Sequence, residues 1–258
     1  MSTPSFSELL FHSRRLDFVP NKYKEIELLR KEFHCIKPKY KIIKRDNRKY
    51  VSLHPRHKIL DSFLFSKLQE QYHLSNNNYS MKGVHAAIKK AYPLFLKTNY
   101  HLKTDIKDYF PSINKKHILE IVQSFNYKKQ LSAILDTENG LPLGLIVSGY
   151  LANFFLKNLD NYYKNYFRYV DDILLFSDNM FKLHNIKSGI EKHLQKYNLK
   201  LNKEKTRIAE NKKLDYLGYV MTPTHLYPRE NIMRSFFSRI KNQDLMTYKP
   251  WFCFPEQY

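Results

Sequence analysis

The sequence predicts an α+β fold, because short apolar strands alternate with amphipathic helices along most of the chain. Its 258 residues, of which 43% are hydrophobic, can bury a sizeable core. Aromatic residues reach 15% of the chain, which excludes long-range disorder. Linkers rich in Gly and Ser are absent from the sequence, so we expect one compact body with subdomains.

The composition is strongly basic. The 44 Lys and Arg residues outnumber 24 Asp and Glu, which gives a formal net charge of +20. This excess argues against an ordinary metabolic enzyme and favours a polyanionic partner, nucleic acid first and an anionic membrane surface second. Two cysteines, Cys35 and Cys253, are too few for a disulfide framework or a zinc cluster. The sequence lacks a long apolar run and a leader pattern, so we expect a cytoplasmic protein without a membrane partner.

The first predicted elements are a β-hairpin and two helices. Aromatic and β-branched residues alternate with cations over 40–45 and 48–51, with Asp46 and Asn47 as the turn. Residues 21–60 hold 13 Lys or Arg against 4 Asp or Glu, so the polar face of the hairpin is either solvated or binds phosphate. Apolar residues one turn apart predict helices from about residue 59 and over 84–96.

A short strand and a helix follow. The strand covers 101–106 and carries the carboxylate of Asp105 near its end. The helix is expected over 111–122, with Ser112 or Asn114 as its N-terminal cap.

The second half of the chain predicts a buried hairpin between helices. Residues 140–144 form a tight turn that leads into a helix with small residues on its first turns. Residues 167–177 are apolar on both sides of Asp171 and Asp172, which indicates a hairpin with the acids at its bend. The last predicted elements are an amphipathic helix over 183–197, a strand over 216–220 and a basic helix from Arg229 onward.

Asp171 and Asp172 are unusual because they are acids within an otherwise apolar run. Adjacent carboxylates repel each other and lose hydration there unless cations compensate them. A plain surface turn is the alternative, but the apolar run 173–176 argues against it. With Asp105 they provide three carboxylates on neighbouring strands, as two divalent ions about 4 Å apart require for in-line phosphoryl transfer. Oxygen ligands without a nearby Cys or His pair favour Mg²⁺ over zinc.

Five segments, in this order, resemble the palm motifs of reverse transcriptases. They are residues 104–113, residues 140–144 with 148 and 151–153, the Tyr-x-Asp-Asp box within 167–172, residues 201–206 and residues 216–219. The resemblance is greatest to the small bacterial enzymes of diversity-generating elements, retrons, group II introns and phage-defence systems. The stretch 152–169 is most similar to the diversity-generating and defence-linked branches.

The resemblance implies a right-hand polymerase with an antiparallel palm sheet backed by helices, mixed fingers and a short, reduced thumb. The corresponding boundaries are 1–35 for an N-terminal extension, 36–98 for the fingers, 99–228 for the palm and 229–258 for the thumb. A thumb of one helix is short. The resemblance therefore implies help from a dedicated structured non-coding RNA, an accessory protein or a second polymerase subunit.

The resemblance also implies catalytic roles. Asp105 and Asp171 would hold two Mg²⁺ ions, for which Mn²⁺ can substitute, with Asp172 in support and the Ile106 carbonyl as a further oxygen ligand. Lys205 would protonate the departing pyrophosphate as a general acid. An ordinary surface lysine is the alternative for Lys205.

The substrate-binding residues that the resemblance implies are Arg48, Lys49, Ile106, Phe110, Pro142, Leu143 and Gly144. Phe110 would lie under the sugar and exclude a 2′-hydroxyl, although core packing also accounts for a buried ring. The family usually carries Gln where this chain has Leu143. Because Leu cannot make the polar contacts of Gln to the template and nucleotide, loose base discrimination is expected.

The leading interpretation is an RNA-directed DNA polymerase that extends a DNA primer on an RNA template with dNTPs, in phage defence or a diversity-generating element. Alternatives are a non-catalytic RNA-binding scaffold, untemplated or protein-primed DNA synthesis, and a metal-dependent nuclease. The intact set of clustered carboxylates argues against the scaffold. The five ordered segments argue against the nuclease.

Overall fold

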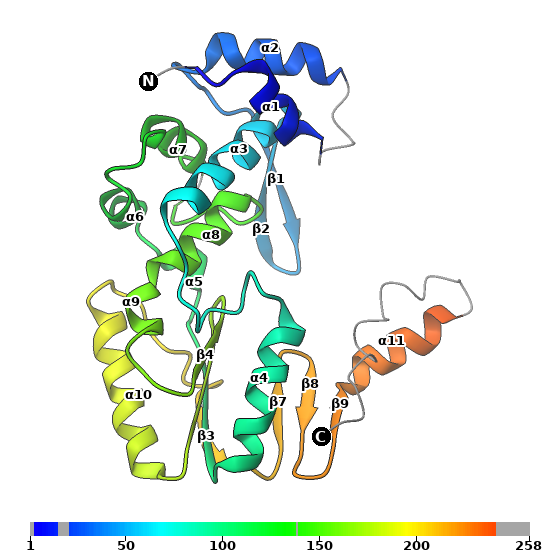
Figure 1. Ribbon diagram of the computed structural model, residues 1–258, viewed down its shortest axis with the longest axis vertical. Coiled ribbons are helices and arrows are strands. Elements are labelled where there is room, and N and C mark those ends of the chain that lie inside the picture. Colours follow the sequence, from blue (N-terminus) through cyan, green and yellow to red (C-terminus); the bar gives the residue numbers. More distant parts are fainter. Residues whose placement is uncertain (1–2, 15–20, 138, 241–258) are drawn as a thin grey trace. The chain divides into compact units, whose positions relative to one another are not determined.

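The computed structural model describes residues 3–14, 21–137 and 139–240 and contains two compact units (Figure 1). Unit 1 comprises Met1–Ser75, Lys107–Asn158 and Lys196–Leu199, and unit 2 comprises Asn76–Ile106, Leu159–Gln195 and Lys200–Tyr258. Each unit is therefore assembled from three separate stretches of chain. Helices and antiparallel sheets occur together, which confirms the predicted α+β class.

Unit 1 is mainly helical. Its elements are α1 (Phe6–Ser13), α2 (Lys22–Glu32), β1 (Tyr40–Arg45), β2 (Arg48–Leu53), α3 (Pro55–Gln71), α5 (Tyr109–Ser112), α6 (Lys115–Ile121), α7 (Lys128–Leu135) and α8 (Ile146–Phe155). Helix α3 contacts α1, α2, α7 and α8, so it is the centre of this unit. Its aromatic core includes Phe33, Phe63 and Tyr127, whose rings pack edge to face.

The predicted hairpin is confirmed as β1 and β2. Asp46 and Asn47 have φ values of 47° and 60°, the left-handed pair that a two-residue hairpin turn needs. The strands register Arg45 opposite Arg48 and Lys44 opposite Lys49. Like charges directly opposite each other weaken strand pairing. The tip of the hairpin is therefore a concentrated site of positive charge.

Unit 2 contains a four-stranded antiparallel sheet in the order β4-β5-β3-β6, and a three-stranded sheet in the order β7-β8-β9. Its elements are α4 (Val84–Lys97), β3 (Tyr100–Asp105), β4 (Tyr166–Tyr169), β5 (Asp172–Ser177), α10 (Met180–Gln195), β6 (Arg207–Glu210), β7 (Leu214–Tyr216), β8 (Tyr219–Met221), β9 (Leu226–Pro228) and α11 (Glu230–Ile240). A short helix, α9 (Lys157–Asp160), contains the boundary between the units.

Two helices pack against the sheets of unit 2 (Figure 1). Helix α10 contacts β3 and β5, and helix α4 contacts β4 and β8. The apolar side of α4 packs with Phe167, Leu174 and Phe176 of the larger sheet and with Tyr216 and Tyr219 of the smaller one. This core fixes the strands whose ends carry the carboxylates.

Two predicted elements are wrong in detail. The helix expected over 111–122 is two short helices, α5 and α6, with Ile113 between them in an extended conformation. Asn114 caps the second helix, as expected, by accepting the Lys116 N–H at 2.9 Å. The strand expected over 216–220 is the hairpin β7–β8. Leu217 and Gly218 have φ values of 48° and 85°, so the chain reverses there.

The basic helix expected from Arg229 onward is confirmed as α11. The rest of the predicted thumb, residues 241–258, lies outside the described residues. Within the described ranges, every helix is too short or too polar to cross a membrane.

Candidate active site

The predicted carboxylates meet at one end of the larger sheet of unit 2. Asp105, the last residue of β3, is the register partner of Asp172, the first residue of β5. Asp172 is also the partner of Tyr169 across the hairpin, so Val170 and Asp171 form its two-residue bend. The Ile106 N–H donates to the Asp171 carbonyl at 3.2 Å, which ties the bend to the neighbouring strand.

Asp105 is only 6% exposed and has two polar side chains against its carboxylate. The Lys205 ammonium donates to Oδ2 at 2.9 Å, and the Asn202 amide donates to Oδ1 at 3.4 Å. The Asn202 backbone N–H also donates to the Asp105 carbonyl at 2.7 Å. The fourth predicted motif therefore lies directly against the first.

A compact turn that follows Asn202 positions Lys205. The Asn202 side chain accepts the Glu204 N–H at 3.2 Å, and the Asn202 backbone carbonyl accepts the Thr206 hydroxyl at 2.7 Å. The Thr206 hydroxyl in turn lies 2.7 Å from the Thr104 hydroxyl on β3. These hydrogen bonds bring Lys205 to the carboxylates although its side chain is 59% exposed.

The electrostatics of the cluster favour a cation. Burial, together with the charges of Asp171 and Asp105, raises the pKa of Asp172 from 3.8 to about 6, and Lys103 and Lys205 oppose this only in part. The hydrogen bond to Asp105 raises the pKa of Lys205, so the ammonium stays protonated. Additional positive charge here would relieve the repulsion between the carboxylates.

The bend of the β4–β5 hairpin has an unfavourable backbone conformation. Val170 has a φ of 57°, in the left-handed region that β-branched residues avoid. Such a conformation costs about 1–3 kcal/mol and persists only where the surroundings enforce it. Here the Val170 N–H donates to the Ser80 hydroxyl at 2.7 Å, and its carbonyl accepts from Arg168 Nη1 at 2.8 Å. The backbone N–H and the carbonyl of Val170 are therefore both hydrogen-bonded to side chains.

A buried ion pair holds Arg168 in turn. Its Nε and Nη2 each donate to a different oxygen of Asp160 at 2.6 Å, and neither residue is exposed. The segment that carries Ser80 runs beside β4, because the Arg168 N–H donates to the Asn77 carbonyl and the Arg168 carbonyl accepts from Tyr79. The Asn77 amide donates to the Asp160 carbonyl at 2.8 Å. The site therefore rests on a buried polar network.

The donor set fits a divalent cation in kind, because it consists of carboxylate oxygens with a carbonyl nearby. Among the residues that the structure describes, no three Asp, Glu, His or Cys side chains are gathered closely enough to hold a metal ion. At Asp105 the Lys205 ammonium takes the position of a cation. Its exposed side chain can move away without disturbing the core.

The predicted substrate-binding residues, apart from Ile106, lie in unit 1. The turn 140–144 is held by its backbone, since the Leu141 N–H donates to the Phe110 carbonyl at 2.9 Å and the Leu143 carbonyl accepts the Val51 N–H at 2.7 Å. A Cβ on Gly144, whose φ is 101°, would lie 2.5 Å from the Val51 carbonyl oxygen. Glycine at 144 therefore permits the turn to pack on β2.

Strand β2 also carries Arg48 and Lys49, and both are exposed at the tip of the hairpin. Phe110 and Leu143 are half-buried, and Pro142 is buried. Unit 1 thus brings the turn into backbone contact with Phe110 and with the strand of the two predicted phosphate-binding cations.

A buried carboxylate supports the same turn from α3. Asp61 is 4% exposed and accepts the Ile146 and Val147 N–H groups, at 2.9 and 3.0 Å, at the start of α8. It therefore caps α8 from another helix, directly after the turn 140–144. Burial raises the pKa of Asp61 to about 6, although these two N–H donors oppose the shift.

The family model for reverse transcriptase (RNA-dependent DNA polymerase) matches residues 35–221. The chain belongs to this family. The match includes every residue to which a catalytic or substrate-binding role is assigned above. Over 123 residues the chain is 28% identical to the retron Ec86 reverse transcriptase of Escherichia coli. This alignment covers 43% of this chain and 38% of that protein.

Solved structures agree in fold with this reverse transcriptase family member. The telomerase of Candida tropicalis in complex with the TWJ fragment of telomeric RNA aligns with a TM-score of 0.56 and 14% identity, over 83% of this chain and 48% of that one. Apo telomerase from the same organism aligns with a TM-score of 0.54 and 15% identity, over 74% of this chain and 48% of that one. The chain thus corresponds to about half the length of these structures.

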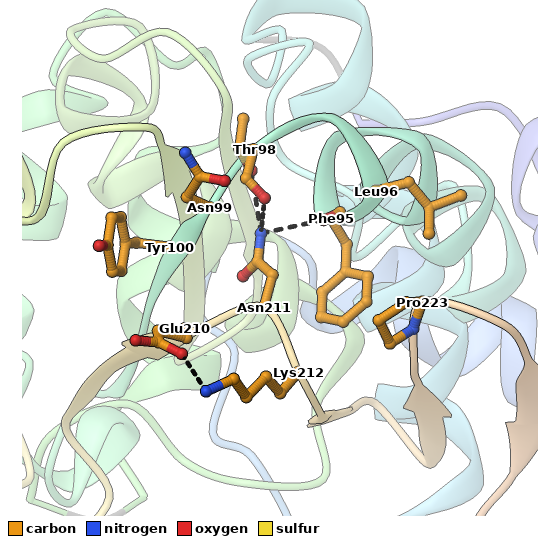
Figure 2. Close-up of a pocket in the computed structure, with 9 residues that line it drawn as sticks. All are labelled: Phe95, Leu96, Thr98, Asn99, Tyr100, Glu210, Asn211, Lys212 and Pro223. Carbon is orange, nitrogen blue, oxygen red and sulfur yellow. Dashed lines mark hydrogen bonds and ion pairs between the residues drawn. The ribbon is translucent and has the colours of Figure 1, made fainter.

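A separate pocket, drawn in Figure 2, lies at the end of β3 that is opposite to Asp105. It has a volume of about 370 Å³ and includes Tyr100, the first residue of β3. The Asn211 amide points to the Thr98 hydroxyl and to the carbonyls of Thr98 and Phe95, at 2.8–3.0 Å, and Glu210 pairs with Lys212. These polar groups bind one another, which indicates a structural junction.

Sequence reasoning gave no role to the residues that hold the carboxylates and the turn 140–144 in place. These are Asp61, Asn77, Ser80, Asp160, Arg168 and Asn202. Arg168 did give a signal, because it is a charge within a buried apolar run and therefore needs a buried partner. Ser80 gave none, since a hydroxyl 90 residues before Val170 has no pattern that links the two.

Proposed function

We propose that this chain is an RNA-directed DNA polymerase that adds deoxynucleotides by two-metal nucleotidyl transfer. The observation that supports this most is the register of Asp105 opposite Asp172, with Asp171 in the adjoining bend and Lys205 against Asp105. Membership in the reverse transcriptase family supports the same reaction.

Asp105 and Asp171 would hold the metal ions, with Asp172 in support and the Ile106 carbonyl as a further oxygen. When bound, two Mg²⁺ ions supply Lewis-acid activation of the attacking hydroxyl and stabilise the charge on the leaving group. The raised pKa of Asp172 supports this assignment, because a cation restores the ionised form that burial and neighbouring carboxylates disfavour.

Lys205 is proposed as the general acid for pyrophosphate. Its ammonium is protonated and exposed on one side, and the turn after Asn202 aims it at the carboxylates. An exposed stem lets the ammonium follow the leaving phosphate while Asn202 keeps its hydrogen bond to Asp105. Proton donation at this point neutralises negative charge as it develops.

The substrate site of unit 1 is proposed to bind the incoming dNTP. Arg48 and Lys49 lie on the hairpin whose like-charge pairs favour an anion, and phosphate is the anion that a nucleotide supplies. Phe110 would exclude a 2′-hydroxyl, and Leu143 in the turn 140–144 would contact the base pair without fixing it by hydrogen bonds.

An RNA template and a DNA primer are the proposed nucleic acids, together with a structured RNA or an accessory protein that completes the thumb. The net charge of +20 supports binding to polyanions. The identity to a retron enzyme supports a bacterial setting. A role in phage defence or a diversity-generating element is proposed from the resemblance of the stretch 152–169.

Primer extension on a primed RNA template tests the proposal. Purified protein is given Mg²⁺ and either the four dNTPs or the four NTPs, beside an Asp171→Ala, Asp172→Ala variant. DNA synthesis that needs the template and is lost in the variant is the expected result. If no template supports synthesis and the co-purifying RNA carries no attached DNA, the scaffold alternative replaces the polymerase.

Replacing Leu143 with Gln is expected to lower misincorporation by about three- to tenfold, the effect of roughly one added hydrogen bond. Single-nucleotide insertion opposite each template base measures the ratio of correct to incorrect kcat/KM. Ile121→Gln is the matched control, because Ile121 is 39% exposed and lies outside the turn. Equal misincorporation by Leu143→Gln and wild type would contradict the proposed role.

A further inference from the structure

A second, larger groove lies in unit 2, and its described lining includes none of the residues with a proposed catalytic or substrate-binding role. It has a volume of about 780 Å³ and is bounded by one side of α4 and by the start of β4. The core-facing side of α4 carries residues such as Ile88 and Phe95, and the groove-facing side carries residues such as Lys89 and Lys90. The helix thus separates a packed side from an open one.

The charge of the groove has a single sign. Its described lining includes Lys82, Lys89 and Lys90 and no acidic side chain. All three lysines are exposed. The Lys82 ammonium donates to the Asn76 carbonyl at 2.7 Å and lies 5.1 Å above the Tyr79 ring, so this charge is fixed in position. The groove is therefore built to attract an anion.

The lysines do not all lie at one point of the groove. Lys82 lies just before the start of α4, and Lys89 and Lys90 lie next to each other within the helix. A single phosphate ester would engage one end only, so a polyanion with repeating charge suits the groove better.

The aromatic rings of the groove indicate which form of nucleic acid it accepts. Tyr79, Tyr166 and Phe167 line it but are only 8%, 1% and 4% exposed. Unpaired bases bind proteins by stacking on exposed ring faces, and these faces are covered by the core. A paired stem presents its sugar-phosphate backbone instead.

One feature of α4 favours RNA over DNA. Pro93 lies inside the helix and in the groove lining, and it has no N–H to donate to the carbonyl of Lys89. Asn165, an exposed residue with a side-chain amide, also lines the groove. A carbonyl and an amide beside the lysines can bind 2′-hydroxyl groups, which DNA lacks.

From these observations we infer that the groove of Lys82, Lys89 and Lys90 binds the backbone of a base-paired RNA stem. The inference deepens the proposed function, because it assigns a surface to the structured RNA partner. The groove is formed within unit 2 and is separate from the carboxylates, so RNA binding there requires neither metal nor nucleotide.

The test compares Lys82→Gln, Lys89→Gln, Lys90→Gln with a matched triple on α10, Lys182→Gln, Lys187→Gln, Lys192→Gln. Both triples remove the same charge from the same unit, and their shared fold is checked by thermal unfolding. Binding of a 20-base-pair RNA hairpin is measured in EDTA at several salt concentrations. Primer extension on a short template-primer is measured in parallel and reports the proposed polymerase separately.

For the groove triple we expect binding about tenfold or more weaker near 0.1 M salt, and a slope of log Kd against log salt smaller by about 2 to 3. The α10 triple should change the slope by less than about 1. The groove triple should weaken the binding of a single-stranded RNA and of a DNA hairpin less than the binding of the RNA stem. Equal loss in both triples, an unchanged slope, or equal loss for all three ligands overturns the inference. The Lys89→Gln, Lys90→Gln double variant replaces the triple if the triple unfolds.

Discussion

Replacing Asp172 with Asn is expected to make the protein more stable and nearly inactive. Burial and the neighbouring carboxylates raise the pKa of Asp172 from 3.8 to about 6, so its ionised form costs free energy in the folded state. Asn is neutral and of nearly the same shape. Removing the charge is expected to slow primer extension by about 10²- to 10³-fold, through the loss of roughly 3–4 kcal/mol of transition-state stabilisation.

The gain in stability has a defined pH dependence. A carboxyl with a raised pKa stabilises the fold while it is protonated, and that contribution is lost as the pH rises through the folded-state pKa. The wild type and Asp172→Asn should therefore unfold with equal free energy below about pH 4. Above about pH 6 the variant should be more stable, by at most about 3 kcal/mol.

Urea unfolding in EDTA from pH 4 to pH 8, together with primer extension, measures both effects. Asp178→Asn is the control, because Asp178 is exposed just after β5 and Asn retains its acceptor for the Asn99 N–H. Loss of activity together with loss of stability would mean that Asp172 is a structural residue.

The second large effect concerns the buried ion pair. Asp160→Ala leaves the Arg168 guanidinium fully buried without its carboxylate, which is expected to lower the free energy of unfolding by about 3–5 kcal/mol. Glu230→Ala removes an exposed partner of Arg234 and should cost less than about 1 kcal/mol. Urea unfolding of the two variants gives the comparison.

A double variant separates stability from catalysis. Asp160→Leu with Arg168→Met replaces the pair by apolar side chains of similar length, which often restores stability. The Val170 carbonyl, however, loses its guanidinium donor. We expect near-normal unfolding together with a reduced kcat at saturating dNTP. Recovery of both properties would show that Arg168 does not position the hairpin.

The sequence predicted the parts of the fold whose signals are local. The hairpin at Asp46 and Asn47 follows from turn residues between alternating strands, and α4 and α10 follow from apolar periodicity. The hairpin β7–β8 was predicted as one strand, because aromatic residues surround Leu217 and Gly218. Gly218 was the available signal for the turn.

The site divides in the same way. Asp171 and Asp172 stand out as acids within an apolar run, and Asp105 stands near the end of a predicted strand, so their place at one end of the sheet was predictable. Ser80 and Asp160 were not, because each acts on a residue in another segment through one hydrogen bond or ion pair. Such pairings depend on tertiary packing, which a single sequence does not encode as a pattern.

Asp61 has a consequence for the proposed role of Leu143 in base selection. Its carboxylate, on α3, holds the first N–H groups of α8 immediately beyond the turn that contains Leu143. A selection for altered fidelity would therefore recover substitutions on α3 as well as in the turn itself. Under the proposed function, evolution can therefore adjust base selection from a helix that need not touch the base pair.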